Sequence, residues 1–165
     1  MSETAIGKIV VGLDGSDDSA RALEWSIRMA RGMGAHVVAV HVIDVPPTYA
    51  APVGLPLQAD PQWHAEMTAV FECAWCSPLR EAGIPYEVVL EPGRPAEVLS
   101  GVAHRMGADI VVVGRHGIGG IHKELPGSVS AELARTCCVP VLTIPRPETQ
   151  RAEAEAAGRE RLAAV

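Results

Sequence analysis

The sequence predicts an α/β fold in which a five-stranded parallel sheet is covered by helices on both faces. Apolar runs typical of strands alternate along the chain with amphipathic segments typical of helices, the order that right-handed crossovers convert into a parallel sheet. The strand runs are continuously apolar, as expected for strands buried on both faces. Aromatic residues make up only 4% of the 165 residues against 48% hydrophobic residues, which favours small-residue helices on a parallel sheet over an aromatic β-sandwich.

The first part of the chain predicts a strand, a helix and a second strand. Residues 8–12 (KIVVG) form the first strand, and the turn residues that follow end at Ser16 or Asp17, either of which can cap a helix. A pair of glycines ends this helix, and residues 36–42 (HVVAVHV) form the second strand. The apolar stripe of the helix consists of Ala20, Leu23, Ile27 and Ala30.

A long loop and an interrupted helix come next. Residues 44–61 contain too much proline and glycine for a helix or a central strand, and loops of this length are functional lids or insertions. Asp60 and Pro61 have the chemistry of an N-cap and a first helical residue, so we expect a helix from there to about Ala82, bent or interrupted near Pro78.

The second half repeats the alternation. We expect strands at 86–90, 109–113 and 139–144, and helices between them. The helix after the third strand ends at a glycine, and the last helix covers about 128–137. Four residues of the helix after the third strand are expected to face the core: Leu99, Val102, Ala103 and Met106.

Two prolines mark the last predicted strand as an edge strand. Pro140 lies near its start and Pro145 at its end, and proline is tolerated mainly at sheet edges. We place the domain at 1–145 and expect the Ala-, Glu- and Arg-rich tail, 146–165, to be a frayed helix or disordered.

The loop after the fourth strand has the composition of a phosphate-binding loop. Gly114 and Gly117 are followed, after nine residues, by Gly127 and Ser128 at the start of a helix. Glycines let backbone N–H groups approach phosphate oxygens, and a helix N-terminus adds unpaired donors and partial positive charge. The spacing is neither that of Walker A nor that of the dinucleotide fingerprint. The alternative is that the glycines only make turns and Ser128 only caps its helix.

The topology brings this loop close to the turn after the first strand. Ligands of parallel sheets bind beyond the carboxyl ends of the strands, so Asp14 and the glycine loop share one edge. Asp14 is either a ligand contact or a residue that shapes the turn into the helix.

These segments resemble the universal stress protein family of the single-domain, UspA type. The resemblance extends from about Gly7 to Pro145 and is carried by KIVVGLDGSDDSARALEW, ADIVVVGRHG and GSVSAELARTCCVPVLTIP. In that family, the spacing G-x2-G-x9-G-[ST] distinguishes the branch that binds ATP. The resemblance implies a doubly wound sheet of the adenine nucleotide alpha hydrolase-like type.

The resemblance also implies roles for individual residues. It places Asp14 near the adenosine and the backbone of Val42 on the adenine. At the phosphates it places the four motif positions and the two residues after them, namely Gly114, Gly117, Gly127, Ser128, Val129 and Ser130. Family members commonly form homodimers through the last strand, here Val139 to Ile144.

One stretch departs from the family pattern. Many members have apolar residues before the final Gly-Ser, whereas this chain has His122 to Pro126. Glu124 would repel a phosphate, whereas four basic residues would attract it, which leaves the sign of the effect open. The basic residues are Arg115, His116, His122 and Lys123.

The leading function is therefore a cytoplasmic, ATP-binding stress or regulatory protein that is not an enzyme beyond slow ATP hydrolysis. Magnesium would enter with the nucleotide, and no metal site of the protein itself is expected. A net charge of −6 argues against nucleic acid, and no apolar run is long enough for a membrane helix. The start, MSETAIGK, lacks the pattern of a signal peptide. The choice among adenine nucleotides and the protein partner stay open.

Two other functions remain. An ATP-using adenylating enzyme would carry an SGGxDS loop after the first strand, where this chain has Asp14 to Ser19 without the paired glycines. A thiol-based redox or partner-binding module would use Cys73 and Cys76, a CxxC that we expect inside a helix rather than at its start. The cytoplasm would keep these thiols reduced.

Overall fold

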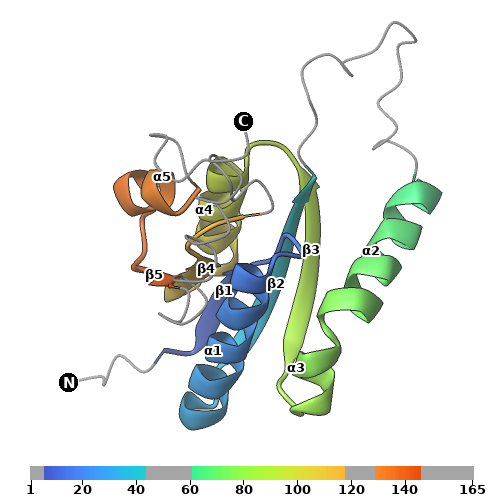
Figure 1. Cartoon of the computed structure of the whole chain (residues 1–165), viewed down its shortest axis with the longest axis horizontal. Coiled ribbons are helices and arrows are strands. Elements are labelled where there is room, and N and C mark those ends of the chain that lie inside the picture. The colour runs from blue at the N-terminus through green and yellow to red at the C-terminus, as the bar shows by residue number, and fades with distance from the viewer. Residues whose placement is uncertain (1–5, 44–60, 118–128, 146–165) are drawn as a thin grey trace, which may run out of the picture.

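The computed structural model describes residues 6–43, 61–117 and 129–145, and it confirms the predicted α/β fold. The sheet has the order β3-β2-β1-β4-β5, and every neighbouring pair of strands is parallel (Figure 1). The elements are β1 (Lys8–Gly12), α1 (Asp17–Met33), β2 (His36–Ile43), α2 (Pro61–Trp75), α3 (Ser77–Glu81), β3 (Tyr86–Pro92), α4 (Pro95–Met106), β4 (Ile110–Gly114), α5 (Val129–Thr136) and β5 (Val141–Ile144).

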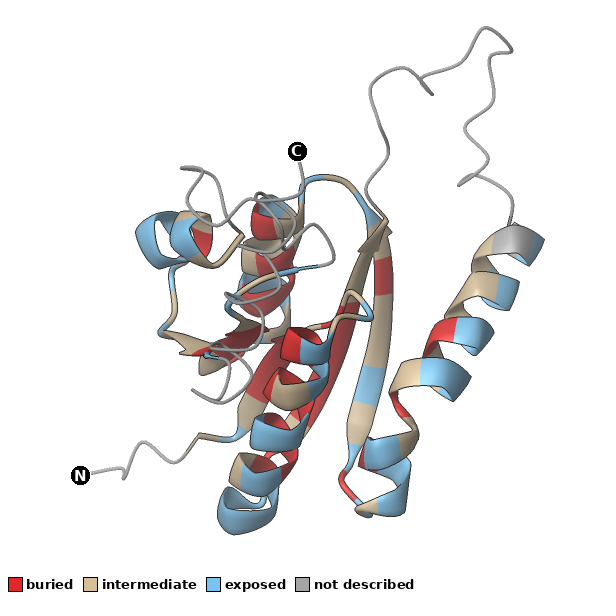
Figure 2. Ribbon diagram, in the orientation of Figure 1, coloured by how far each residue is buried: buried red, intermediate tan, exposed pale blue. Residues whose placement is uncertain are grey.

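The helices form one layer on each face of the sheet. α1, α2 and α3 pack on one face, and α4 and α5 pack on the other (Figure 1). Successive residues of β1 show why the strands are apolar throughout: Ile9 and Val11 belong to the first core, whereas Val10 belongs to the second. The buried residues follow the strands and the inner sides of the helices (Figure 2).

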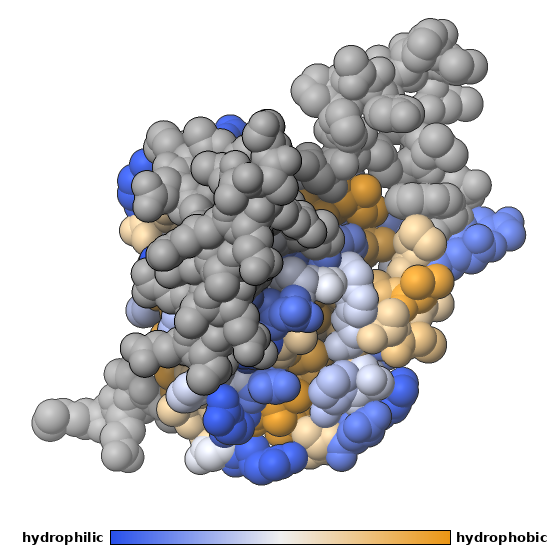
Figure 3. Space-filling model, viewed as in Figure 1, coloured by the Kyte–Doolittle hydropathy of each residue, from blue (hydrophilic) through white to orange (hydrophobic). Residues whose placement is uncertain are grey.

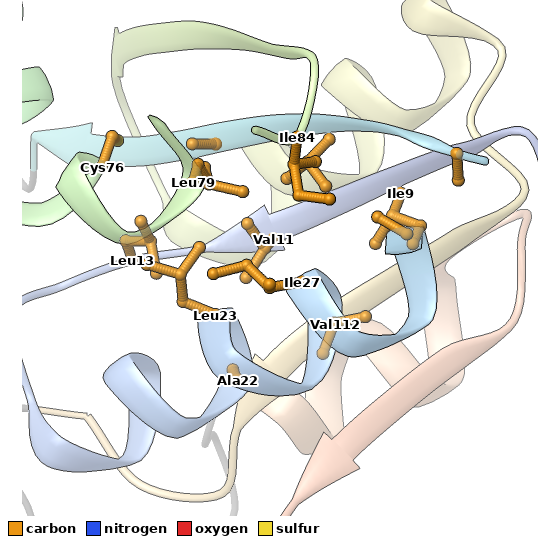
Figure 4. Packing of buried hydrophobic residues seen from close by; sticks show 14 of the residues in the cluster. Ile9, Val11, Leu13, Ala22, Leu23, Ile27, Cys76, Leu79, Ile84 and Val112 are labelled. Atoms are coloured by element: carbon orange, nitrogen blue, oxygen red, sulfur yellow. The ribbon is translucent and has the colours of Figure 1, made fainter. Parts of the chain in front are cut away.

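The larger core lies between the sheet and the α1 layer. Leu23 and Ile27 of α1 meet Val11 of β1, and Leu79 of α3 closes the same layer (Figure 4). A fully buried leucine contributes about 1.5–3 kcal/mol relative to an exposed one. This packing fixes α1 against the sheet and with it the turn that joins β1 to α1.

Both ends of α1 have regular caps. Ser16 is the N-cap, and its side chain accepts a hydrogen bond from the backbone N–H of Ser19 at 3.2 Å. Gly34 ends the helix in the left-handed conformation, with φ of 68°. The predicted stripe was wrong at Ala20, which is exposed, whereas Ala22 is buried. The reason is that α1 begins at Asp17, which sets the phase of the helix.

The interruption of the next helix is confirmed. α2 ends at Trp75 and α3 begins at Ser77, with buried Cys76 between them. Pro78 lies in the first turn of α3, where the missing N–H costs no hydrogen bond. The exposed side of α2 is apolar where it carries Ala69, Val70, Cys73 and Ala74, and hydrophobic residues gather over this helix (Figure 3).

The two edges of the sheet are β3 and β5. The edge position of β5 confirms the prediction from its prolines, although the strand begins at Val141 rather than Val139. The opposite edge, β3, carries Glu87, which is 3.0 Å from His36 Nε2, and Glu91, which pairs with Arg105.

Several predictions concern residues outside the described ranges. They are the proline-rich loop, the departure at 122–126, the motif residues Gly127 and Ser128, and the tail from 146. Among the helices that the structure describes, none combines the length and the apolar character that crossing a membrane requires.

Candidate functional site

The candidate site lies between β1 and β4, where the order in which strands are added to the sheet reverses. β1 and β4 are neighbours, although a helix, two strands and further helices separate them in the sequence. In such sheets the loops beyond the carboxyl ends of these two strands diverge onto opposite faces and leave room for a ligand. Asp14 follows β1, and residues 115–117 follow β4, so the structure brings the predicted residues of the two loops together.

Asp14 is held by the turn that it makes. Its Oδ1 accepts hydrogen bonds from the backbone N–H of Ser16 at 3.0 Å and from the Ser16 hydroxyl at 2.6 Å. This Asx turn is the structural role that the sequence left open. The half-buried carboxylate also faces the loop after β4, so the turn role and a ligand role are compatible.

The two described glycines of the motif are places of close approach. A Cβ on Gly117 would lie 2.6 Å from Asp14 Oδ2, and a Cβ on Gly114 would lie 2.6 Å from the backbone carbonyl carbon of Asp18. Real Cβ atoms do not come this close to other heavy atoms, so a side chain at Gly114 would have to move the backbone of α1, whereas one at Gly117 would have to displace the Asp14 carboxylate. These two glycines therefore let the loop after β4 pack against the turn after β1 and the first turn of α1.

Asp18 is the residue that sequence reasoning missed. An acid in the first turn of a helix ordinarily complements the helix dipole from a solvated position, but the side chain of Asp18 is 0% exposed. One carboxylate oxygen pairs with Arg21 at 2.6 Å, and the other accepts from the backbone N–H and ring Nδ1 of His116, both at 3.1 Å. The available signal was helical spacing, because Asp18 lies four residues before the buried Ala22.

The N-terminus of α1 is therefore occupied by the protein itself. The Ser16 cap satisfies one of its N–H groups, and Asp17 and Asp18 bring negative charge into its first turn. An anion is disfavoured at this helix. The uncharged part of a ligand is better suited to the α1 side, and an anionic part to the other side.

α5 lies on that other side. Val129 is its first helical residue and packs against the second core, and the Ser130 hydroxyl lies 3.5 Å from the carbonyl oxygen of Arg115. The backbone N–H of Arg115 donates to Ile144 at 3.0 Å, which ties the loop to the end of β5. The exposed Arg115 side chain adds a cation at this end.

The loop after β1 also has an aromatic neighbour. The Trp75 ring of α2 contacts Gly15, where a Cβ would lie 2.7 Å from Cζ2. Trp75 packs edge-on against His41 and Phe71, with ring centroids 4.8 and 5.3 Å away. His41 Nδ1 is 2.8 Å from the Leu13 carbonyl oxygen, a contact that ties β2 to the start of the loop after β1. Val42 follows in β2, half-buried and paired with Glu91 of β3.

His64 joins α2 to the sheet. Its Nε2 lies 2.9 Å from the Leu90 carbonyl oxygen, and this contact ties α2 to β3. The helix turns this half-buried side chain toward the sheet rather than toward solvent.

The cysteines do not have the geometry of a redox site. Cys73 is exposed and Cys76 is buried between α2 and α3, and all four cysteines of the chain are free. Burial, with a smaller effect from Glu72, raises the pKa of the Cys76 thiol to about 11. A reactive pair needs a lowered pKa, so this arrangement disfavours thiolate chemistry at Cys76.

Comparison with known proteins gives a consistent result. Residues 5–145 match the model of the universal stress protein family. The chain is 29% identical over 152 residues to universal stress protein MJ0531 from Methanocaldococcus jannaschii, covering 90% of this chain and 87% of that protein.

Two solved structures with similar folds contain adenine nucleotides. The first is a universal stress protein in complex with cAMP, which is 28% identical, with a TM-score of 0.65 over 86% of this chain and 98% of that one. The second is a universal stress protein family protein from Arabidopsis thaliana with AMP bound; its 22% identity and TM-score of 0.60, over 87% and 94% of the two chains, show the shared fold. From its sequence and its fold alike, this chain belongs to the universal stress protein family.

Proposed function

We propose that the chain binds an adenine nucleotide, with ATP as the principal ligand, between the loops that follow β1 and β4. The observation that carries this proposal is the close approach of Gly117 to the Asp14 carboxylate, at the point where the strand order reverses. A Cβ on Gly117 would lie 2.6 Å from Asp14 Oδ2. The motif loop and the acidic turn are thereby parts of one site. The cAMP complex of a relative that is 28% identical supports an adenine nucleotide as the ligand class.

The charges favour one orientation of the nucleotide. Asp14 and the acidic first turn of α1 suit the adenosine, whose hydroxyl groups donate hydrogen bonds, and Val42 offers its backbone to the adenine. The phosphates would lie toward α5, where Val129 and Ser130 begin the helix, together with the motif residues Gly127 and Ser128. Magnesium would bind to the phosphates rather than to a carboxylate cluster of the protein.

The role that we propose is regulatory rather than catalytic. The carboxylate of Asp18 already accepts hydrogen bonds from Arg21 and His116, and that of Asp14 from Ser16, so neither is well placed to activate water. Hydrolysis should therefore be slow. The nucleotide would act by shifting the equilibrium between two states of a cytoplasmic homodimer that pairs through β5, and so change its affinity for a protein partner.

The test is direct binding. Purified protein is denatured and any released nucleotide is identified by mass spectrometry, and calorimetry then measures ATP, AMP and cAMP, with GTP as the control for the base. We expect saturable binding of adenine nucleotides and much weaker binding of GTP. If ATP gives no saturable heat at millimolar concentration, the proposal is wrong.

A further inference from the structure

Asp18 and His116 form a hydrogen-bonded pair at the edge of the proposed site. The carboxylate of Asp18 is fully buried, and His116 reaches it with both its backbone N–H and its ring Nδ1 at 3.1 Å. Arg21 completes the environment with an ion pair at 2.6 Å. The imidazole therefore has a fixed position, unlike that of a histidine on a free surface.

The pair fixes the tautomer of the ring. A carboxylate paired with an arginine accepts hydrogen bonds and cannot donate one, so Nδ1 of His116 must carry the proton. In the neutral ring, Nε2 then has a lone pair and no hydrogen. It makes no hydrogen bond within the described part of the chain, and the side chain is 31% exposed.

His116 also lies next to Asp14. Its neighbour Gly117 packs on the Asp14 carboxylate, and the Ser16 hydroxyl that donates to Asp14 is 3.5 Å from the His116 carbonyl oxygen. The backbone of His116 and Gly117 thus borders the Asp14 turn, and two hydrogen-bond acceptors, the Asp14 carboxylate and His116 Nε2, come from these two adjoining loops. A ligand group that fits two acceptors is a hydroxyl-bearing group and not a phosphate, which is itself an acceptor.

We propose that His116 is a specificity residue that accepts a hydrogen bond from a ribose hydroxyl through Nε2, and that Asp18 is the positioning residue that holds the proton of the neutral ring on Nδ1 and so leaves Nε2 as the acceptor. The inference rests on the proposed function and adds a sugar preference to it. It also reverses the sequence-based grouping of His116 with the cations that attract phosphate.

The test compares ATP with 2′,3′-dideoxy-ATP by calorimetry at pH 8.5, where a histidine imidazole is ordinarily neutral. We expect the wild type to bind ATP more tightly, and His116→Phe to lose about five- to tenfold of this preference, taken as the ratio of the affinities for the two nucleotides. His116→Gln keeps an acceptor close to the position of Nε2 and should regain part of the preference.

The tautomer of His116 can be measured directly by NMR. The ¹⁵N spectrum of the His116 ring should show a pyrrole-like Nδ1 and a pyridine-like Nε2. Asp18→Asn can donate an amide hydrogen to Nδ1, which should reverse the two signals and lower the sugar preference. If Asp18→Asn does not fold, the wild-type spectrum and the two His116 variants still decide the matter.

The outcomes separate the two proposals. No binding of ATP to the wild type overturns the proposed function. Binding of ATP with a sugar preference that His116→Phe leaves unchanged, or an Nε2 that carries a proton in the wild type, overturns the assignment of His116 alone.

Discussion

The backbone of Gly114, at the end of β4, lies against the backbone of Asp18 in the first turn of α1, so that a Cβ on Gly114 would be 2.6 Å from the Asp18 carbonyl carbon. Both partners in this contact are main chain and belong to packed elements. The contact sets how closely the loop after β4 approaches α1.

We predict that Gly114→Ala lowers the free energy of unfolding by about 1–3 kcal/mol, because the added methyl group must push two packed elements apart. Denaturation in urea measures the change. Gly101→Ala in α4 is the matched control, since its Cβ would meet only the end of the Arg105 side chain at 3.6 Å. The control should be stabilising by about 0.5–1 kcal/mol. Equal effects of the two substitutions would contradict the contact.

Gly117→Ala should act on binding more than on stability. Its Cβ would meet Asp14 Oδ2 and displace a carboxylate that Ser16 holds in place. We expect ATP affinity to fall by about tenfold, the equivalent of one charged hydrogen bond. Gly32→Ala in α1, which has open space around its Cβ, serves as the control in calorimetry and should bind ATP as the wild type does.

Trp75 should report ligand binding by its fluorescence, since its ring contacts Gly15 in the turn that carries Asp14. The chain has three tryptophans, at 25, 63 and 75. We expect ATP to change the emission of a Trp25→Phe variant as it changes that of the wild type, and to leave the emission of Trp75→Phe nearly constant. A full response in Trp75→Phe would place the ligand elsewhere.

The cysteines of the CxxC should differ in reactivity. Cys73 is exposed, whereas Cys76 is buried and its pKa is raised to about 11. With iodoacetamide at pH 8, mass spectrometry should find rapid labelling of Cys73 and labelling of Cys76 only after unfolding. Rapid formation of a Cys73–Cys76 disulfide under mild oxidation would revive the redox alternative.

Stability should fall in alkaline solution. The fold favours the protonated Cys76 thiol and raises its pKa from 9.0 to about 11, so the stabilisation is complete below pH 9 and is lost as the pH rises through 11. The loss amounts to about 2–3 kcal/mol. Tyr86 acts in the same direction, because its hydrogen bond to Glu72 raises its pKa. Urea denaturation between pH 8 and 11 should show a shallower decline for Cys76→Ala, and Tyr86→Phe separates the contribution of the tyrosine.

Much of the architecture could be predicted because its causes are local. The apolar run at residues 8–12 coincides with β1. The interruption near Pro78 and the edge position of β5 both follow from the missing N–H of proline, which is tolerated in the first turn of a helix and at the edge of a sheet. The shared edge of Asp14 and Gly117 followed from strand order, which the alternation of helices and strands restricts strongly.

The remainder depended on contacts between distant residues. Asp18 and His116 are 98 positions apart, and nothing near Asp18 in the sequence distinguishes a buried acid from a solvated one. The contact of His64 could not be predicted either, because its partner is the Leu90 carbonyl oxygen, a backbone atom of a kind that every residue has. Contacts of this kind become visible only when the elements are placed in space.

The two edge strands of the sheet differ, and this difference limits how many copies of the chain can join edge to edge. β5 carries no charge and is only four residues long, with Pro140 before it and Pro145 after it, whereas β3 presents Glu87 and Glu91. A strand of another copy could join the first edge over a short stretch but would meet carboxylates at the second. When two copies pair through β5, both β5 edges are used and no further copy can be added there. This chain should therefore resist growth into fibrils, even at the high concentrations at which exposed strands otherwise seed them.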